Sequence, residues 1–357
     1  MGKCIVIMAG GTGGHVFPAL AVAELLLEKG WKVSWLGTQN GLESRIIPEH
    51  GIEIDWLMVA GIRGKGFWSK LKAILSSVRA CLQAAKILNK RKPDVVLGMG
   101  GFVAGPGGLM AKLMGIPLII HEQNRVPGST NRLLACFASQ VLEGFPGSFK
   151  AKVKAQVTGN PLRNKFVTTL EKQPKNLEGV IRILVVGGSQ GAKILNEIVP
   201  EAIAEFNQLN GNNSEILIRH QTGLVMMSQV DSSYKKLAIK ADVIAFIEDM
   251  VSAYNWADLV ICRAGAMTIS EVAAIGLPSI LIPLPSAIDD HQTANAHYLS
   301  EAGAGIILLQ NDMTPLSLAE SIKRALNELP QMSNAAKECA LLDATQLVAE
   351  YCITEAV

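Results

Sequence analysis

A histidine follows a glycine-rich loop near the start of the chain. The stretch "IVIMAGGTGGHVFPAL", residues 5–20, sets His15 directly after Gly13 and Gly14, between an apolar run and a helical pattern. Histidine titrates near neutral pH, so at the carboxyl end of a strand it could take a proton from a hydroxyl group. The glycines let a ligand approach the backbone, and the N-terminus of the following helix favours a phosphate. The alternative is a tight strand-to-helix turn with His15 merely exposed.

This loop does not match the dinucleotide-binding fingerprint. From Gly11 the chain reads Gly-Thr-Gly-Gly-His-Val, so the third glycine of G-x-G-x-x-G is missing. The next apolar run, "KVSWLG", is followed by Thr38 and Gln39 and not by the acid that would hold a ribose. NAD binding in this half is therefore disfavoured.

A second glycine loop, "GGSQG" at residues 187–191, has the G-x-S-x-G pattern of a hydrolase nucleophile elbow. Residues that could complete a triad with Ser189 follow in the right chain order: Asp258 or Asp289, then His291 or His297. A hydrolase, however, does not explain the similar glycine loop of the first half. We therefore favour a Ser189 that donates a hydrogen bond to a phosphate or a sugar.

A third loop, in "CRAGAMTISEVAAIGLP" at residues 262–278, leads from a strand into a helix that begins near Thr268 and stops at Gly276. Backbone N–H groups at such a helix N-terminus can bind a diphosphate. The residues that would form it are Ala266, Met267, Thr268, Ile269 and Ser270. Glu271, expected on the first turn, could accept two ribose hydroxyls, or could only complement the helix dipole.

Two further loops carry clustered polar side chains. "IIHEQNRVPGSTNR", residues 119–132, ends a buried-type strand with His121, Glu122 and Asn124, and "SAIDDHQTANA", residues 286–296, contains His291, Gln292 and Asn295. Such clusters serve either a substrate or an inter-loop network. His121 and Glu122 either compete with His15 as the base or orient it. No Asp-x-Asp occurs, so a metal-held diphosphate is not expected.

Short apolar runs alternate with helical patterns along the chain, which predicts an α/β protein with parallel sheets. The pattern restarts at "IRILVVGGSQGAKILNEIV", residues 181–199, after the turn "TGNPLRN". We expect two Rossmann-like domains, 1–160 and 161–339, and a last helix at about 340–357 that could pack back on the first. Ligands bind at the carboxyl ends of the strands in such sheets, where both glycine loops lie.

One segment is strongly basic. Residues 56–93 contain nine Lys or Arg and no Asp or Glu, and apolar residues recur there at helical spacing. An amphipathic helix covering the sheet explains part of this stripe. The residues predicted to contact an anionic membrane are Lys65, Phe67, Trp68, Lys70 and Lys72. Nucleic acid is the alternative partner, but the segment has few aromatic residues between its basic residues for that role.

The six cysteines show no metal-ligand or disulfide spacing, which favours a reducing cytoplasm. The apolar run near the N-terminus is too short for the hydrophobic region of a signal peptide, so export is not expected.

Together, "GGTGGH", "GGFVAGPGG", "HEQNRVPGSTNR", "GNPLR", "VVGGSQGA", "CRAGAMTISE" and "DDHQTANA" resemble the MurG family of peptidoglycan glycosyltransferases, in order over most of the chain. The resemblance implies a GT-B fold and an inverting transfer of GlcNAc from UDP-GlcNAc to the MurNAc C4 hydroxyl of lipid I, giving lipid II and UDP. It implies no cofactor, and a peripheral location at the cytoplasmic face of the bacterial plasma membrane. Other cell-wall synthesis proteins are further candidate partners.

The resemblance also implies roles for single residues. It makes His15 the candidate base, with supporting roles open to His121, Glu122, Asn131, His291 and Asn295. The residues expected to bind substrate are Thr12, Gly13, Gly14, Asn124, Arg163, Ser189, Ile247 (through its backbone), the 266–270 loop, Glu271 on the ribose and Gln292 on the sugar. The family often has Tyr where Phe102 stands and Gln where His291 stands, so a role that needs those groups is in doubt here.

Overall fold

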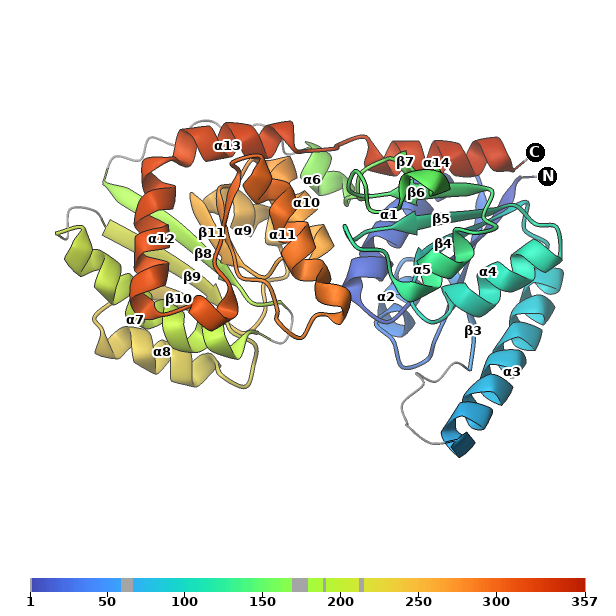
Figure 1. Cartoon of the computed structure of the whole chain (residues 1–357), viewed down its shortest axis with the longest axis horizontal. Helices are drawn as coiled ribbons and strands as arrows, with labels where there is room; N and C mark the ends of the chain where they lie inside the picture. Colours follow the sequence, from blue (N-terminus) through green and yellow to red (C-terminus); the bar gives the residue numbers. More distant parts are fainter. Residues whose placement is uncertain (1, 59–66, 169–178, 189–190, 212–214, 357) are drawn as a thin grey trace. The chain divides into compact units, whose positions relative to one another are not determined.

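The structure, a computed structural model, describes residues 2–58, 67–168, 179–188, 191–211 and 215–356, and only the backbone of residues 67–74, 168 and 288. The chain forms two compact units. Unit 1 consists of residues 1–163 and 341–357, and unit 2 of residues 164–340. The chain returns from unit 2 to unit 1 before its last helix, drawn in red in Figure 1.

Unit 1 alternates strands and helices. In chain order they are β1 (Cys4–Ala9), α1 (Gly13–Glu28), β2 (Lys32–Gly37), α2 (Glu43–Glu49), β3 (Glu53–Trp56), α3 (Phe67–Arg91), β4 (Val95–Gly100), α4 (Ala104–Leu113), β5 (Leu118–Glu122), α5 (Ser129–Leu134), β6 (Gln140–Glu143), β7 (Gln156–Val157) and, after unit 2, α14 (Ala344–Glu355).

The sheet of unit 1 is parallel, with strand order β3-β2-β1-β4-β5-β6-β7. Alternate residues of β1 point to opposite faces, as strand geometry requires. Ile5 and Ile7 belong to a core with α1 and α14, whereas Val6 and Met8 belong to a core with α3 and α4. Both faces are covered, which explains why β1 reads as one apolar run.

Unit 2 repeats this design. Its elements are α6 (Asn164–Thr168), β8 (Val180–Val186), α7 (Lys193–Leu209), β9 (Glu215–Gln221), α8 (Met227–Lys236), β10 (Ala241–Ile244), α9 (Met250–Trp256), β11 (Leu259–Cys262), α10 (Ala266–Ile275), β12 (Ser279–Leu281), α11 (His291–Glu301), β13 (Gly305–Ile307), α12 (Pro315–Asn327) and α13 (Leu329–Glu338). Its parallel sheet has the order β10-β9-β8-β11-β12-β13.

The two sheets have the same topology around their first strands. In each, the first strand lies between the second and the fourth, so the chain reverses its direction of winding beside β1 and beside β8. A crevice for ligands opens at such a switch point, beyond the carboxyl ends of the strands. Each glycine loop follows one of these two strands. The doubly wound α/β class predicted from the sequence is confirmed.

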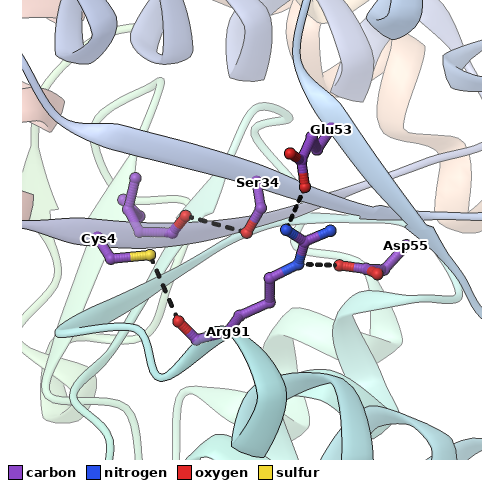
Figure 2. A network of polar contacts seen from close by, with 6 residues as sticks. Cys4, Ser34, Glu53, Asp55 and Arg91 are labelled. Carbon is purple, nitrogen blue, oxygen red and sulfur yellow. Dashed lines mark hydrogen bonds and ion pairs between the residues drawn. The ribbon is translucent and has the colours of Figure 1, made fainter.

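The segment between β2 and β4 contains a strand as well as two helices. It forms α2, the short strand β3 and α3. Glu53 and Asp55 lie two residues apart on β3 and therefore on one face, where both bind the guanidinium of Arg91. Figure 2 shows Arg91 between these carboxylates, with its backbone carbonyl accepting from Cys4 Sγ. This network ties the C-terminal end of α3 to the edge of the sheet.

Each unit buries one neutral histidine, which predicts a loss of stability in acid. Burial lowers the pKa of His121 to about 4 and that of His220 to about 3. The unfolded chain binds these protons near pH 6.5, so below that pH it holds more protons than the folded chain, and the unfolding free energy falls as pH falls. We expect a loss of about 2 kcal/mol from each histidine between pH 7.5 and pH 5.

Urea denaturation at the two pH values measures this loss. Replacing His220 by Gln should reduce the pH dependence, whereas His50→Gln, at a half-exposed histidine, should not. Equal pH dependence in wild type and His220→Gln would contradict the prediction.

Candidate active site

The first glycine loop connects β1 to α1 in unit 1. The Thr12 carbonyl accepts from the backbone N–H groups of His15 and Val16, so α1 begins immediately after Thr12. No side chain of the described part of the chain caps this helix end. The N–H groups of its first residues, Gly13 and Gly14, therefore have no partner within the helix and could bind an anionic group.

Glu43, at the start of α2, fixes this loop. Its carboxylate is fully buried and accepts from Gly11 N at 2.9 Å, from Thr38 N at 2.9 Å and from Thr38 Oγ1 at 2.7 Å. The loop after β1 is thereby joined to the loop after β2. We did not identify Glu43 from the sequence, because the acid comes from the next helix and not from the strand end.

Replacing Glu43 by Gln is expected to destabilise the protein by about 1–3 kcal/mol. An amide offers one acceptor oxygen to three donors and directs its NH₂ group at one of them, which leaves a buried donor unsatisfied. Thermal unfolding followed by circular dichroism measures the loss. Glu49→Gln, at an exposed position of the same helix, is the matched control. Equal melting temperatures in the two variants would contradict this role.

His15 lies at the switch point between β1 and β4. Its Nδ1 atom is 2.8 Å from Gln123 Oε1, and its ring packs on Gly100 at the end of β4. Gly100 has a φ of +102°, and a Cβ added there would lie 2.8 Å from His15 Cε1. A side chain at position 100 would therefore displace the imidazole.

The two alternatives to His15 as the base are engaged elsewhere. His121 is fully buried, with Nε2 2.9 Å from the Gly159 carbonyl. The buried Glu122 carboxylate accepts from Asn124 N, Asn124 Nδ2, Gly128 N and Asn131 Nδ2 at 3.0–3.2 Å. Glu122 therefore organises the loop that presents Asn124, and the buried Asn131 takes part in the same network.

Arg163 lies beside the first glycine loop. Its guanidinium is 5.4 Å from the centroid of the Phe17 ring on α1, and a Cβ at Gly13 would lie 2.9 Å from that same ring. The Arg163 guanidinium and the N-terminus of α1 therefore both lie close to the Phe17 ring in unit 1.

In unit 2, Gln221 joins two loops expected to contact the nucleotide. Its Nε2 donates to the Gly188 carbonyl at 2.8 Å, and its Oε1 accepts from Ile247 N at 2.9 Å. The N–H group of Ile247 is thereby used, which leaves its carbonyl for a ligand. Gly191 is confined as well, because a Cβ there would lie 1.9 Å from the Thr222 carbonyl oxygen. Ser189 lies outside the described residues.

The loop after β11 leads into α10, which begins at Ala266, two residues before the predicted start. Glu271 therefore lies in the second turn and not in the first as expected; its Oε2 accepts from the Tyr254 hydroxyl at 3.3 Å. The first turn contains no acid, and no side chain among the residues with described positions caps it. The side chains of Ala266 and Ile269 are buried, so these residues offer a ligand their backbone.

Two polar side chains donate hydrogen bonds to main-chain carbonyls in or near the loop between β11 and α10. Arg263 donates to the carbonyls of Ile282 and Pro283 at 3.0 and 3.2 Å, and the fully buried Asn295 donates to the Ala264 carbonyl at 3.2 Å. Gln292, in the first turn of α11 beside His291, accepts from Leu284 N at 3.0 Å. Arg263 also donates to Gln310 Oε1 at 2.7 Å. The sequence did not single out Arg263, because its acceptors lie 19 to 47 residues away in the chain.

The geometry excludes one of the two acids of the hydrolase alternative, Asp258. Asp258 immediately precedes β11, which pairs in parallel with β8, whereas residues 187–191 follow β8. Asp258 thus lies at the opposite edge of the sheet, where it accepts from Arg182 N at 2.9 Å. Within the described residues, no group of three or more His, Cys, Asp or Glu side chains could hold a metal ion.

Comparisons with known proteins agree with this architecture. Residues 5–143 match the glycosyltransferase family 28 N-terminal domain, and residues 182–350 match its C-terminal domain. The chain is 56% identical, over its full length and 99% of the relative, to a Methylococcus capsulatus protein named UDP-N-acetylglucosamine–N-acetylmuramyl-(pentapeptide) pyrophosphoryl-undecaprenol N-acetylglucosamine transferase. The crystal structure of Acinetobacter baumannii MurG covers 99% of both chains at 40% identity, with a TM-score of 0.84. The chain belongs to the MurG family.

A protein of the same name from Shewanella sp. strain MR-4 is 48% identical over 99% of this chain and 97% of its own length. The glycotransferase of kitacinnamycin, at 15% identity and a TM-score of 0.73, shares the fold alone. The GT-B fold implied by the resemblance to the MurG family is confirmed.

Proposed function

We propose that this chain transfers GlcNAc from UDP-GlcNAc to lipid I, giving lipid II and UDP in peptidoglycan synthesis. The main support for this function is the 56% identity of the chain, from end to end, to a relative named for that transfer. Two glycine loops at the two switch points agree with it, since a sugar nucleotide and a lipid-linked sugar both carry diphosphates that helix N-termini can bind.

The chemistry follows from the site. Inverting transfer needs a base for the MurNAc C4 hydroxyl and stabilisation for the departing UDP. We assign the base to His15, the part-exposed histidine of the first loop. The N-terminus of α10 and Arg163 are our candidates for stabilising the diphosphate, and Glu271 for binding the ribose.

The remaining substrate contacts stay proposals. They are Thr12, Gly13, Gly14 and Asn124 in unit 1, and Ser189, the Ile247 carbonyl and Gln292 in unit 2. In the structure Gln292 Oε1 accepts from Leu284 N, so its amide NH₂ is the group we expect on the sugar hydroxyls. His291 and Asn295 support that loop.

The test is to incubate the protein with UDP-GlcNAc and a short-chain lipid I analogue and to detect the product by mass spectrometry. We expect an increase of one N-acetylhexosamine residue. Free GlcNAc with an unmodified acceptor would instead indicate a hydrolase.

We place this activity at the cytoplasmic face of the plasma membrane, with α3 as the contact. The described part of α3 exposes Leu75, Val78 and Leu82, which recur at helical spacing on one face. Leu113, at the end of α4, is exposed as well. No helix in the described residues is both long and apolar enough to cross a bilayer. A peripheral contact through apolar and basic side chains fits this surface.

Reversing three charges is expected to weaken binding to anionic vesicles at least tenfold. Lys65 lies outside the described residues, and the side chains of Phe67, Trp68, Lys70 and Lys72 are not described, so this prediction rests on the sequence. Each lysine adds about 1 kcal/mol near an anionic surface. Flotation of the Lys65→Glu, Lys70→Glu, Lys72→Glu variant at low salt measures the loss.

The matched control reverses three exposed lysines of unit 2, Lys193, Lys236 and Lys323, for the same change of net charge. Equal flotation of the two triple variants would show that net charge, and not α3, governs binding.

A further inference from the structure

We propose that Gln123 and His121 set the tautomer of His15 through a relay of hydrogen bonds that begins at the Gly159 carbonyl. The relay leaves the proton of the neutral His15 ring on Nδ1 and a free electron pair on Nε2. Gln123 and His121 are then positioning residues. This inference rests on the proposed role of His15 as the base, because only the unprotonated nitrogen can take a proton from a hydroxyl.

The first step fixes His121. Its Nε2 lies 2.9 Å from the Gly159 carbonyl oxygen, which only accepts hydrogen bonds, so Nε2 carries a proton. The side chain is fully buried, and burial lowers its pKa to about 4. His121 is therefore neutral near pH 7 and has a single ring proton. Its Nδ1 is left as an acceptor.

The second step fixes the amide of Gln123. One end of this amide lies 3.0 Å from His121 Nδ1 and 3.2 Å from the His121 carbonyl oxygen. Both partners accept, so the group that faces them is the NH₂ end. The carbonyl oxygen of the amide must then face the other way, toward His15.

The third step fixes His15. Gln123 Oε1 lies 2.8 Å from His15 Nδ1 and can only accept, so Nδ1 carries the proton. In a neutral imidazole the other nitrogen then holds the electron pair. Among the residues that the structure describes, Nε2 of His15 has no hydrogen-bond partner. The relay thus presents the basic nitrogen of the ring to a substrate.

The members of the relay are held by their surroundings. Gln123 is 1% exposed, and its backbone carbonyl accepts from Asn160 Nδ2 at 3.0 Å. Gly159 packs against Leu341, where the chain re-enters unit 1. Gly100 lies against the His15 ring, where a Cβ would come within 2.8 Å of His15 Cε1. Neither Gln123 nor His121 carries a charge, so the two positioning residues orient the base without burying an ion, which would be costly.

Nitrogen NMR of the whole protein tests the proposal, because ¹⁵N chemical shifts separate protonated from unprotonated ring nitrogens. The chain has six histidines, so single substitutions assign the spectrum of ¹⁵N-histidine-labelled protein. At pH 8 we expect a protonated Nδ1 and an unprotonated Nε2 for His15. An unprotonated His15 Nδ1 in the wild type would overturn the proposal, whatever the variants do.

The Gln123→Met variant removes all three hydrogen bonds of the Gln123 amide at similar side-chain volume. We expect its His15 proton to distribute over both nitrogens, and kcat to fall about tenfold or more through the misplaced base, with the KM for UDP-GlcNAc within about twofold. Unchanged His15 signals would overturn the relay. Thermal unfolding followed by circular dichroism reports whether the variant is folded. Ser148→Ala, which removes another buried side-chain hydrogen bond of unit 1, should leave the His15 signals and kcat unchanged.

Failure of the relay and failure of the base assignment are distinguishable. If His15→Ala retains full turnover while the wild type shows the expected tautomer, the proposed role of His15 is wrong and the relay stands. If His15→Ala is inactive but the tautomer is reversed, the relay is wrong.

Discussion

The His15→Ala variant is expected to lower kcat at least about 100-fold while UDP still binds with near wild-type affinity. A positioned general base contributes about 10²–10⁴-fold to a rate, and the other two candidate bases, His121 and Glu122, are buried and hydrogen-bonded. The UDP contacts proposed for unit 2 do not involve this side chain. Steady-state kinetics with a lipid I analogue and calorimetric titration with UDP measure the two quantities.

His50→Ala is the matched control, because this histidine of unit 1 is half exposed and pairs with Glu24. It should retain ordinary turnover. Ordinary turnover in His15→Ala as well would remove His15 from the role of base.

The Glu271→Ala variant is expected to raise the KM for UDP-GlcNAc about 10- to 100-fold with a smaller change in kcat. A hydrogen bond to a charged group contributes about 1.5–3 kcal/mol, and the ribose offers two hydroxyls to this carboxylate. The ribose takes no part in bond breaking. Loss of the contact between Glu271 and the ribose therefore weakens donor binding more than it slows the chemical step.

Tyr254→Phe gives a graded comparison. It removes the hydroxyl that donates to Glu271 Oε2 at 3.3 Å but leaves the carboxylate itself. We expect a KM between those of the wild type and Glu271→Ala. An unchanged KM in Glu271→Ala would refute the ribose contact, whatever the effect on kcat.

The fold was predictable because strands of parallel sheets are buried on both faces and read as apolar runs. β1, β4 and β8 are of this kind. Strands β3, β7 and β13 could not be predicted in this way. They have only two to four residues, form sheet edges and lack fully buried side chains, so no apolar run marks them.

The loops of the site were predictable because ligands bind where strands end at a switch point. The side chains that hold those loops were less so. Glu43 and Arg263 bind main-chain atoms of other loops, and Gln221 joins two loops that lie more than 50 residues apart in the chain. Spacing within one motif carries no information on such partners. The choice among His15, His121 and Glu122 as the candidate base likewise depends on their burial and hydrogen-bond distances, which the sequence does not contain.

We propose that this chain couples loss of UDP to attack by the MurNAc C4 hydroxyl. The most direct measurement is the rate of UDP release from UDP-GlcNAc with no acceptor, with a lipid I analogue, and with the same analogue lacking the C4 hydroxyl. We predict UDP release only with the intact analogue, and a β-linked product. UDP release at one rate in all three reactions, or in none of them, would contradict this coupling.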